Sequence, residues 1–144
     1  MKIDEIKALW EKDSTIMEDD LANESLKIPK LHSKYYNIYI SEKLILRKME
    51  SDHKLLKRLK YEYYLGRLSI EQIKELGWDQ FELKILRSEL DTYIDSDSNI
   101  IESLLKIGTQ HEKVLFIENI IKCINGRGFH IKGAIDFLKW TNGA

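Results

Sequence analysis

Residues 54–67 read Lys54-Leu-Leu-Lys-Arg-Leu-Lys-Tyr-Glu-Tyr-Tyr-Leu-Gly-Arg67, and they close the longest helical pattern in the chain. The pattern follows Pro29, the only proline, and it contains no glycine or proline before Gly66. Its apolar residues recur at steps of three and four, as on one face of an α-helix. The stretch therefore predicts one long helix over roughly 30–65. A hairpin broken by a turn near Asn37–Ser41 remains the alternative.

Shorter helical patterns flank this run on both sides. Residues 2–12 predict a short amphipathic helix, and a second one is expected to start near Asp19 or Asp20, because acidic side chains suit the first turn of a helix. Beyond Gly66, a capping-box pattern at 69–72 predicts a short helix that ends at Gly77, and a similar pattern at 79–82 predicts a helix through about residue 93. No segment alternates with period two over the length of a strand. The predicted fold class is all-α.

The C-terminal third is strongly apolar. We expect a helix stop at Asn125-Gly126, and Gly108-Thr109 is either a turn or part of one long helix. Cys123 lies among isoleucines and is predicted to be a buried small apolar side chain. A single cysteine cannot form an internal disulfide and fits a reducing compartment. No run approaches the roughly 20 apolar residues of a membrane span, and the first residues lack the apolar run of a signal peptide.

Charge is divided into blocks that the net value of −1 conceals. Residues 1–26 carry three Lys/Arg against eight Asp/Glu, and residues 27–67 carry eleven against four. Residues 68–102 return to three against nine, and residues 103–144 carry six against three. Each surface can therefore have its own sign, so a nearly neutral chain is compatible with a polyanionic partner or with pairing between acidic and basic faces of two subunits.

Several functional classes lack support in the sequence. There is no nucleophile-elbow, Walker or dinucleotide-binding motif, and no zinc-ligand spacing, so we expect neither catalysis nor a metal or other cofactor. Residues 68–90 resemble a helix-turn-helix, but the candidate recognition helix at 79–91 is acidic, which is unsuited to the major groove. The sequence therefore predicts a non-catalytic protein that does not bind duplex DNA through such a helix.

The basic run at 54–67 is the best functional signal. Cations beside aromatic rings are typical of a groove for single-stranded nucleic acid, where the charges follow the phosphates and the rings accept bases. The same residues are also compatible with a solvated helix face followed by core tyrosines, or with a face that binds an acidic helix. The tyrosines stay open between base stacking and core packing. They are Tyr61, Tyr63 and Tyr64.

Two segments resemble the UvsY family of phage recombination mediator proteins. One is the run Leu56-Lys-Arg-Leu-Lys-Tyr-Glu-Tyr-Tyr-Leu-Gly-Arg67, and the other is Asn125-Gly-Arg-Gly-Phe-His-Ile-Lys132. The order of acidic N-terminus, basic helix, acidic middle and apolar C-terminal helices also agrees. The resemblance implies a helical protomer that assembles as a ring, a hexamer or heptamer, and binds single-stranded DNA without sequence preference. It would help a RecA-like recombinase load onto strands covered by single-strand DNA-binding protein, in the cytoplasm of the infected host cell.

The resemblance also assigns residues. The family's DNA-contacting basic pair falls on Arg58 and Lys60. Their position in the same run leads us to expect that Lys54, Lys57 and Arg67 assist this pair. Residues 1–98 would form the DNA-binding helical region and residues 99–144 the self-association region, whose apolar face exceeds what a thin monomer can bury. The residues expected to self-associate are Leu104, Leu105, Leu115, Phe116, Ile120, Ile124 and Phe129. The rival hypothesis is a helical oligomeric adaptor that assembles through opposite charges and never binds nucleic acid.

Overall fold

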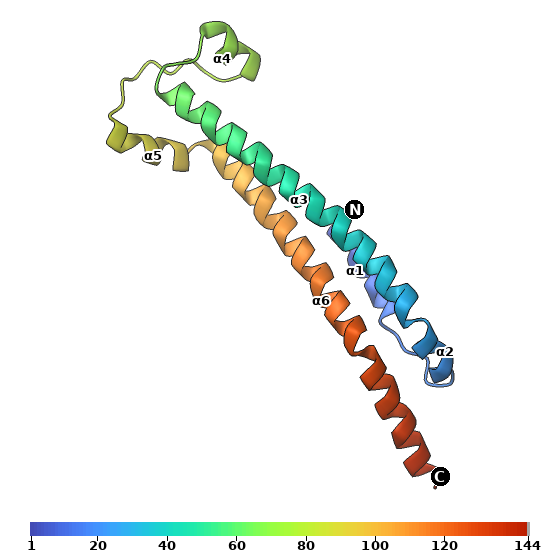
Figure 1. The fold of residues 1–144 in the computed structure, drawn as a ribbon. Helices are drawn as coiled ribbons and strands as arrows, with labels where there is room; N and C mark the ends of the chain where they lie inside the picture. The colour runs from blue at the N-terminus through green and yellow to red at the C-terminus, as the bar shows by residue number, and fades with distance from the viewer. Residues whose placement is uncertain (144) are drawn as a thin grey trace. The chain divides into compact units, whose positions relative to one another are not determined.

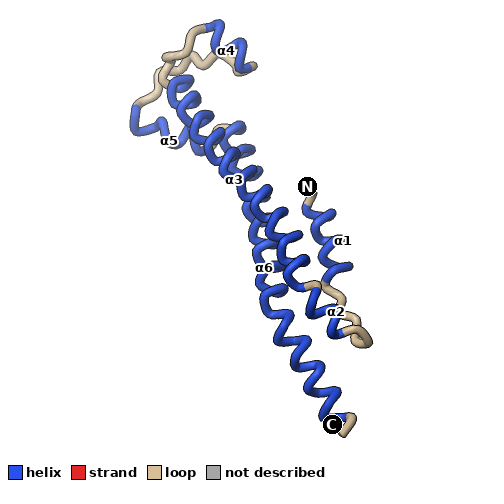
Figure 2. The backbone as a smooth tube through the Cα atoms, turned by 45° about the vertical axis from the view of Figure 1, so that its right-hand side comes forward, coloured by secondary structure: helices blue, strands red, loops and turns tan. Residues whose placement is uncertain are grey.

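The computed structural model describes residues 1–143, and within them it contains helices and loops but no strand (Figure 2). The predicted all-α class is confirmed. In chain order the helices are α1 (Ile3–Asp13), α2 (Leu21–Leu26), α3 (Ile28–Tyr64), α4 (Ile70–Leu76), α5 (Arg87–Asp95) and α6 (Ser98–Thr141). Figure 1 shows α3 and α6 as long, unbroken helices. No helix of the described residues is long and apolar enough to cross a membrane.

The basic run lies at the C-terminal end of α3, which is one continuous helix, so the hairpin alternative is excluded. Pro29 occupies its first turn, where a missing N–H has no helical partner to lose. At the other end, Gly66 has a φ of 72°. Its N–H donates to the carbonyl of Tyr63, and the N–H of Arg67 donates to that of Glu62. This is the pattern of a Schellman motif, so the expected glycine stop is confirmed.

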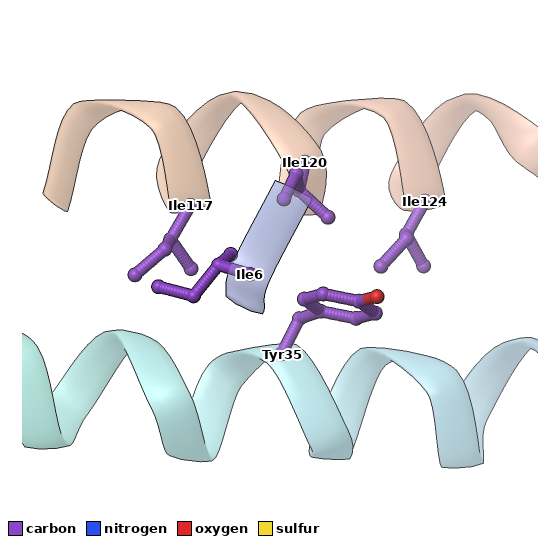
Figure 3. Packing of buried hydrophobic residues seen from close by; sticks show 5 residues of the cluster. All are labelled: Ile6, Tyr35, Ile117, Ile120 and Ile124. Atoms are coloured by element: carbon purple, nitrogen blue, oxygen red, sulfur yellow. The ribbon is translucent and has the colours of Figure 1, made fainter. Parts of the chain in front are cut away.

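The chain divides into two compact units, one made of residues 1–44 with those from 110 onward and the other of residues 45–109. The core of the first unit gathers side chains from α1, α3 and α6 (Figure 3). Tyr35 is completely buried there, and its hydroxyl donates to Asp13 at 2.9 Å. The apolar face of the short amphipathic helix α1 therefore packs against α3 and α6, as its periodicity predicts. The cluster consists of Ile6, Tyr35, Ile117, Ile120 and Ile124.

Buried charges also hold the first unit together. Glu42 is 2% exposed. Its carboxylate accepts hydrogen bonds from the amino group of Met1 at 3.1 Å, the side-chain amide of Gln110 at 2.8 Å and the amino group of Lys113 at 3.3 Å. Burial alone would raise the pKa of Glu42, but these hydrogen bonds outweigh it and lower that pKa. Nothing in the spacing of Glu42 along α3 indicated this role, because its partners come from the N-terminus and from α6, which are far from Glu42 in the sequence.

Arg127 provides the second buried charge of this unit. Its guanidinium donates to the backbone carbonyls of Asp13 and Thr15 at 2.8 and 3.1 Å, and it forms an ion pair with Glu24 at 3.2 Å. Both charged side chains are almost fully buried. The arginine thereby fastens the loop after α1 and the helix α2 to α6.

Two helix predictions were wrong. α6 continues through Asn125-Gly126, because Ile124, Arg127 and Ile131 all pack inward and hold the helical ladder against the local preference for a stop. Gly108-Thr109, which was predicted as either a turn or part of one long helix, is part of α6. The predicted helix over 79–93 starts only at Arg87, and residues 78–86 form a loop. This loop packs its aromatic rings against α3, which outweighs the capping pattern at 79–82. Residues 79–86 therefore do not form the first part of the candidate recognition helix.

The predictions for the three shorter helices α1, α2 and α4 are confirmed. α1 and α2 occur where expected, and α4 begins with the Ser69 and Gln72 capping box and ends at Gly77, whose φ is 73°. The division into functional regions at residue 98 stays a prediction, because compactness divides the chain along different lines. No group of three or more metal-ligating side chains occurs within residues 1–143.

Candidate nucleic-acid interface

The last three turns of α3 line an open depression of about 460 Å³ on the second unit. Four of the five predicted basic residues border it. The complete lining is Lys54, Lys57, Arg58, Tyr61, Glu62, Leu65 and Arg67, and we call this surface the basic depression. The lysines and arginines recur at helical steps of three and four up to the glycine turn, so that one side of the helix presents them together.

The cations of the basic depression are exposed and weakly paired. Arg58 keeps 77% of its side chain exposed, and its only carboxylate neighbour within residues 1–143 is Glu62 at 4.0 Å. An exposed pair at this distance contributes little to stability and is readily exchanged for a phosphate. Lys54, Lys57 and Arg67 are exposed as well. The depression therefore offers a positive surface at little cost of desolvation, which is what non-specific phosphate binding requires.

Lys60 does not lie on this surface, which corrects the sequence-based expectation. Its side chain is 3% exposed and forms an ion pair with Asp97 at 3.0 Å. It also donates to Asn99 at 2.9 Å and lies 3.7 Å from the ring centroid of Trp78. Because residues two apart on a helix point in different directions, Arg58 and Lys60 cannot share one face. The cation that the resemblance assigns to DNA is used here inside the protein.

Asp97 is the centre of this buried group. One carboxylate oxygen accepts from the backbone N–H groups of Asn99 and Ile100, at 2.9 and 3.1 Å, and so caps the start of α6. The other accepts from Lys60 and from the hydroxyl of Tyr64 at 2.6 Å. Burial alone would raise the pKa of Asp97, but the hydrogen bonds from Tyr64, Lys60 and the Ile100 amide outweigh it, and that pKa is lowered.

The three tyrosines divide between the two hypotheses. Tyr63 is buried, its ring packs against Trp78, and its hydroxyl donates to the carbonyl of Asp79, so it belongs to the core. Tyr64 is half-buried in the same aromatic cluster, and burial with the hydrogen bond to Asp97 raises its pKa. Only Tyr61 lines the basic depression, where its hydroxyl donates to Asp91 at 2.9 Å. Base stacking thus remains a candidate role for one tyrosine of the three.

The expected self-association residues also divide. Ile120 and Ile124 are 2% and 0% exposed, because they fill the core of their own protomer, and this corrects their assignment to a subunit contact. Phe116 is half-buried against the same core. The others remain exposed on α6, at 51% for Leu104, 67% for Leu105, 39% for Leu115 and 82% for Phe129. Cys123 is exposed rather than buried, which is a further correction.

Two residues that line the basic depression were not predicted from the sequence. Glu62 and Leu65 follow Arg58 and Tyr61 by one helical turn, so they extend the same face of α3. The signal that could have found them is this periodicity: positions 54, 58, 61 and 65 fall on one side of the helix, whereas position 60 does not. Grouping the cations by their closeness in sequence was therefore misleading.

Comparisons with a family model, with a curated protein sequence and with solved structures all point to the same family. A family model described as "Recombination, repair and ssDNA binding protein UvsY" matches residues 9–144. The recombination protein uvsY of Enterobacteria phage T4 is 26% identical over 147 residues, and the match spans 99% of each chain. Two crystal structures of the bacteriophage T4 recombination mediator protein UvsY have TM-scores of 0.83 and 0.79, at 22% and 20% identity. The first match covers 99% of this chain and 98% of the crystal structure's chain. The second covers 98% of this chain and 99% of the crystal structure's chain.

Proposed function

This chain belongs to the UvsY family of recombination, repair and ssDNA-binding proteins, and we propose that it binds single-stranded DNA at the basic depression. The observation that carries this proposal is that four exposed cations and one partly exposed tyrosine line a single depression. Phosphates of an extended strand would pair with Lys54, Lys57, Arg58 and Arg67. Lys60 is left out of the contact set because its charge is already used by Asp97.

The mediator role follows as the wider proposal. The T4 relative is called a recombination mediator protein, and this chain shares its fold over nearly all of its length. We propose that this chain likewise helps a RecA-like recombinase to load onto strands covered by single-strand DNA-binding protein, in the cytoplasm of the infected host cell. Binding and presenting a strand require no bond to be made or broken, so the proposed role is non-catalytic.

Self-association would strengthen DNA binding at the basic depression. If several protomers form a ring, each presents its own basic depression, and a strand that contacts several of them gains avidity without tighter binding at any one. The exposed apolar side chains of α6 support such an assembly, because a monomer would leave them in water. Phe129, at 82% exposure, is the most exposed of the predicted set.

Removal of two cations tests the DNA-binding proposal. We expect the double variant Lys57→Ala/Arg58→Ala to bind labelled oligo(dT) more weakly in fluorescence anisotropy and to show a shallower dependence of log K on log salt. Each lost phosphate contact on a single strand should reduce that slope by about 0.7. Lys74→Ala is the matched control, because Lys74 is an exposed lysine on α4 that does not line the depression. An unchanged slope in the double variant would refute the site, and no binding by the wild type at low salt would favour the adaptor hypothesis.

A charge placed at position 129 tests self-association. We expect Phe129→Asp to sediment as a smaller species than the wild type, because the new carboxylate would have to be desolvated in an apolar subunit contact. Ser88→Asp is the control, since it adds the same charge at an exposed position of α5, outside the predicted self-association residues. Truncation near residue 98 is unsuitable as a test, because α6 supplies three of the five buried residues in the core cluster of the first unit. If Phe129→Asp keeps the wild-type sedimentation coefficient, Phe129 lies outside the subunit contact.

A further inference from the structure

A second group of aromatic rings lies on α3, outside the basic depression. His32, Tyr36 and Tyr39 are spaced by four and three residues, which places them on one face of the helix. The rings of His32 and Tyr36 are 5.7 Å apart and nearly parallel, at 13°. Those of Tyr36 and Tyr39 are 6.0 Å apart at 28°. We call these three side chains the aromatic row.

The aromatic row is open to solvent at its centre. Tyr36 is 46% exposed, whereas His32 and Tyr39 are half-buried. Tyr39 also packs against the core of the first unit, which anchors that end of the row. A tyrosine needed only for packing would bury its ring, as Tyr35 does one position earlier. The ring of Tyr36 is instead left available to a flat partner, with neighbours that hold it in a defined orientation.

A lysine lies beside the aromatic row. The amino group of Lys43 donates to the hydroxyl of Tyr39 at 2.9 Å and lies 5.2 Å from its ring centroid. The only carboxylate in residues 28–44 is Glu42, which is buried with its own cationic partners. A ligand at this surface therefore meets aromatic faces and the Lys43 cation without a competing exposed carboxylate from this part of the helix.

We propose that the aromatic row is a base-stacking site for single-stranded DNA, separate from the phosphate contacts of the basic depression. Flat rings in similar orientation accept unstacked bases of any identity, and a nearby lysine can pair with a phosphate of the same strand. This inference rests on the proposed function, because it concerns how the same ligand is held. It assigns to His32, Tyr36 and Tyr39 a role that the basic run alone does not supply.

Stacking and phosphate pairing can be separated by removing the bases. Affinities are measured by fluorescence anisotropy for labelled oligo(dT) and for an abasic strand of equal length, at several salt concentrations. We expect Tyr36→Ala to weaken oligo(dT) binding by about fivefold to a hundredfold, the range for one lost base–ring stack. Binding of the abasic strand and the salt slope should not change, because no cation is removed. Tyr36→Phe should restore the affinity, since it keeps the ring.

Leu44→Ala is the matched control, because Leu44 is an apolar residue of α3 with 57% exposure and lies outside the row. The inference is overturned if Tyr36→Ala binds oligo(dT) as the wild type does, or if it weakens both strands equally. It is also overturned if the loss of affinity accompanies a smaller sedimenting species, which would make Tyr36 a subunit contact. A wild type that binds through Arg58 with no preference for bases refutes only this inference, whereas a wild type that binds neither strand refutes the proposed function as well.

Discussion

Replacing Lys60 with methionine should lower the free energy of unfolding by about 3–5 kcal/mol, the usual cost of removing one partner from a buried ion pair. Methionine fills a similar volume but leaves the carboxylate of Asp97 without a cation in the interior. Tyr64 and the two amides of α6 remain as partners, which favours the lower end of this range. Urea denaturation at fixed protein concentration would measure the change as a lower midpoint with an unchanged slope.

Lys57→Met is the matched control for this variant. Lys57 lies three residues earlier on α3 and is exposed, so its replacement should change stability by no more than about 0.5 kcal/mol. In DNA binding we expect the opposite order: Lys57→Met should bind more weakly than Lys60→Met, because only the loss of Lys57 removes an exposed cation. Equal unfolding midpoints for the two variants would contradict the buried role of Lys60.

The pH dependence gives a second readout of the same variant. Because the pKa of Asp97 is lowered in the folded protein, its carboxylate contributes stability above the ordinary value of 3.8. That contribution is lost as the pH falls through the lowered value. The difference in unfolding free energy between the wild type and Lys60→Met should therefore narrow as the pH falls below about 3.8. It should be smallest below the lowered pKa, because a protonated Asp97 has no negative charge for Lys60 to neutralise. A difference that stays constant with pH would point to lost packing instead.

Arg127→Met should destabilise the first unit by a similar amount, about 3–5 kcal/mol. Within residues 1–143 the variant leaves the buried Glu24 with one ion-pair partner, the exposed Lys27 at 3.2 Å. It also removes the donors to the backbone carbonyls of Asp13 and Thr15, at the end of α1 and just beyond it. A buried acceptor without a donor carries the full cost of its desolvation. Thermal unfolding followed by circular dichroism would detect the change as a lower melting temperature.

A double variant separates the charge from the other contacts of Arg127. Arg127→Met/Glu24→Leu removes the stranded carboxylate together with the arginine, so it should recover part of the lost stability. Lys122→Met is the control, because Lys122 is an exposed cation on the same helix. If the double variant is less stable than Arg127→Met alone, the carboxylate of Glu24 is stabilising in its own right and the ion pair is not the reason for its burial.

The long helices show what could be predicted from periodicity. The run from Pro29 to Gly66 specified α3 because nothing in it favours a break and the glycine can adopt the positive φ of a Schellman motif. α6 could not be bounded in this way. Asn125-Gly126 is a local stop signal, and it is overridden because Ile124 and Arg127 on either side have partners on α1, α2 and α3. Those partners lie far away in the sequence.

The basic run by itself determined where the positive surface lies and that a continuous helix carries it, because residue type and a period of 3.6 are local properties. Only the tertiary structure decided which of its side chains face outward. Lys60 is drawn inward by Asp97 and Trp78, and Tyr63 by the aromatic loop that follows α4. Arg58 stays exposed, and Tyr61 stays half-buried where α5 contacts it through Asp91. Long-range packing, which spacing does not encode, separates the structural cation from those left free to meet a phosphate.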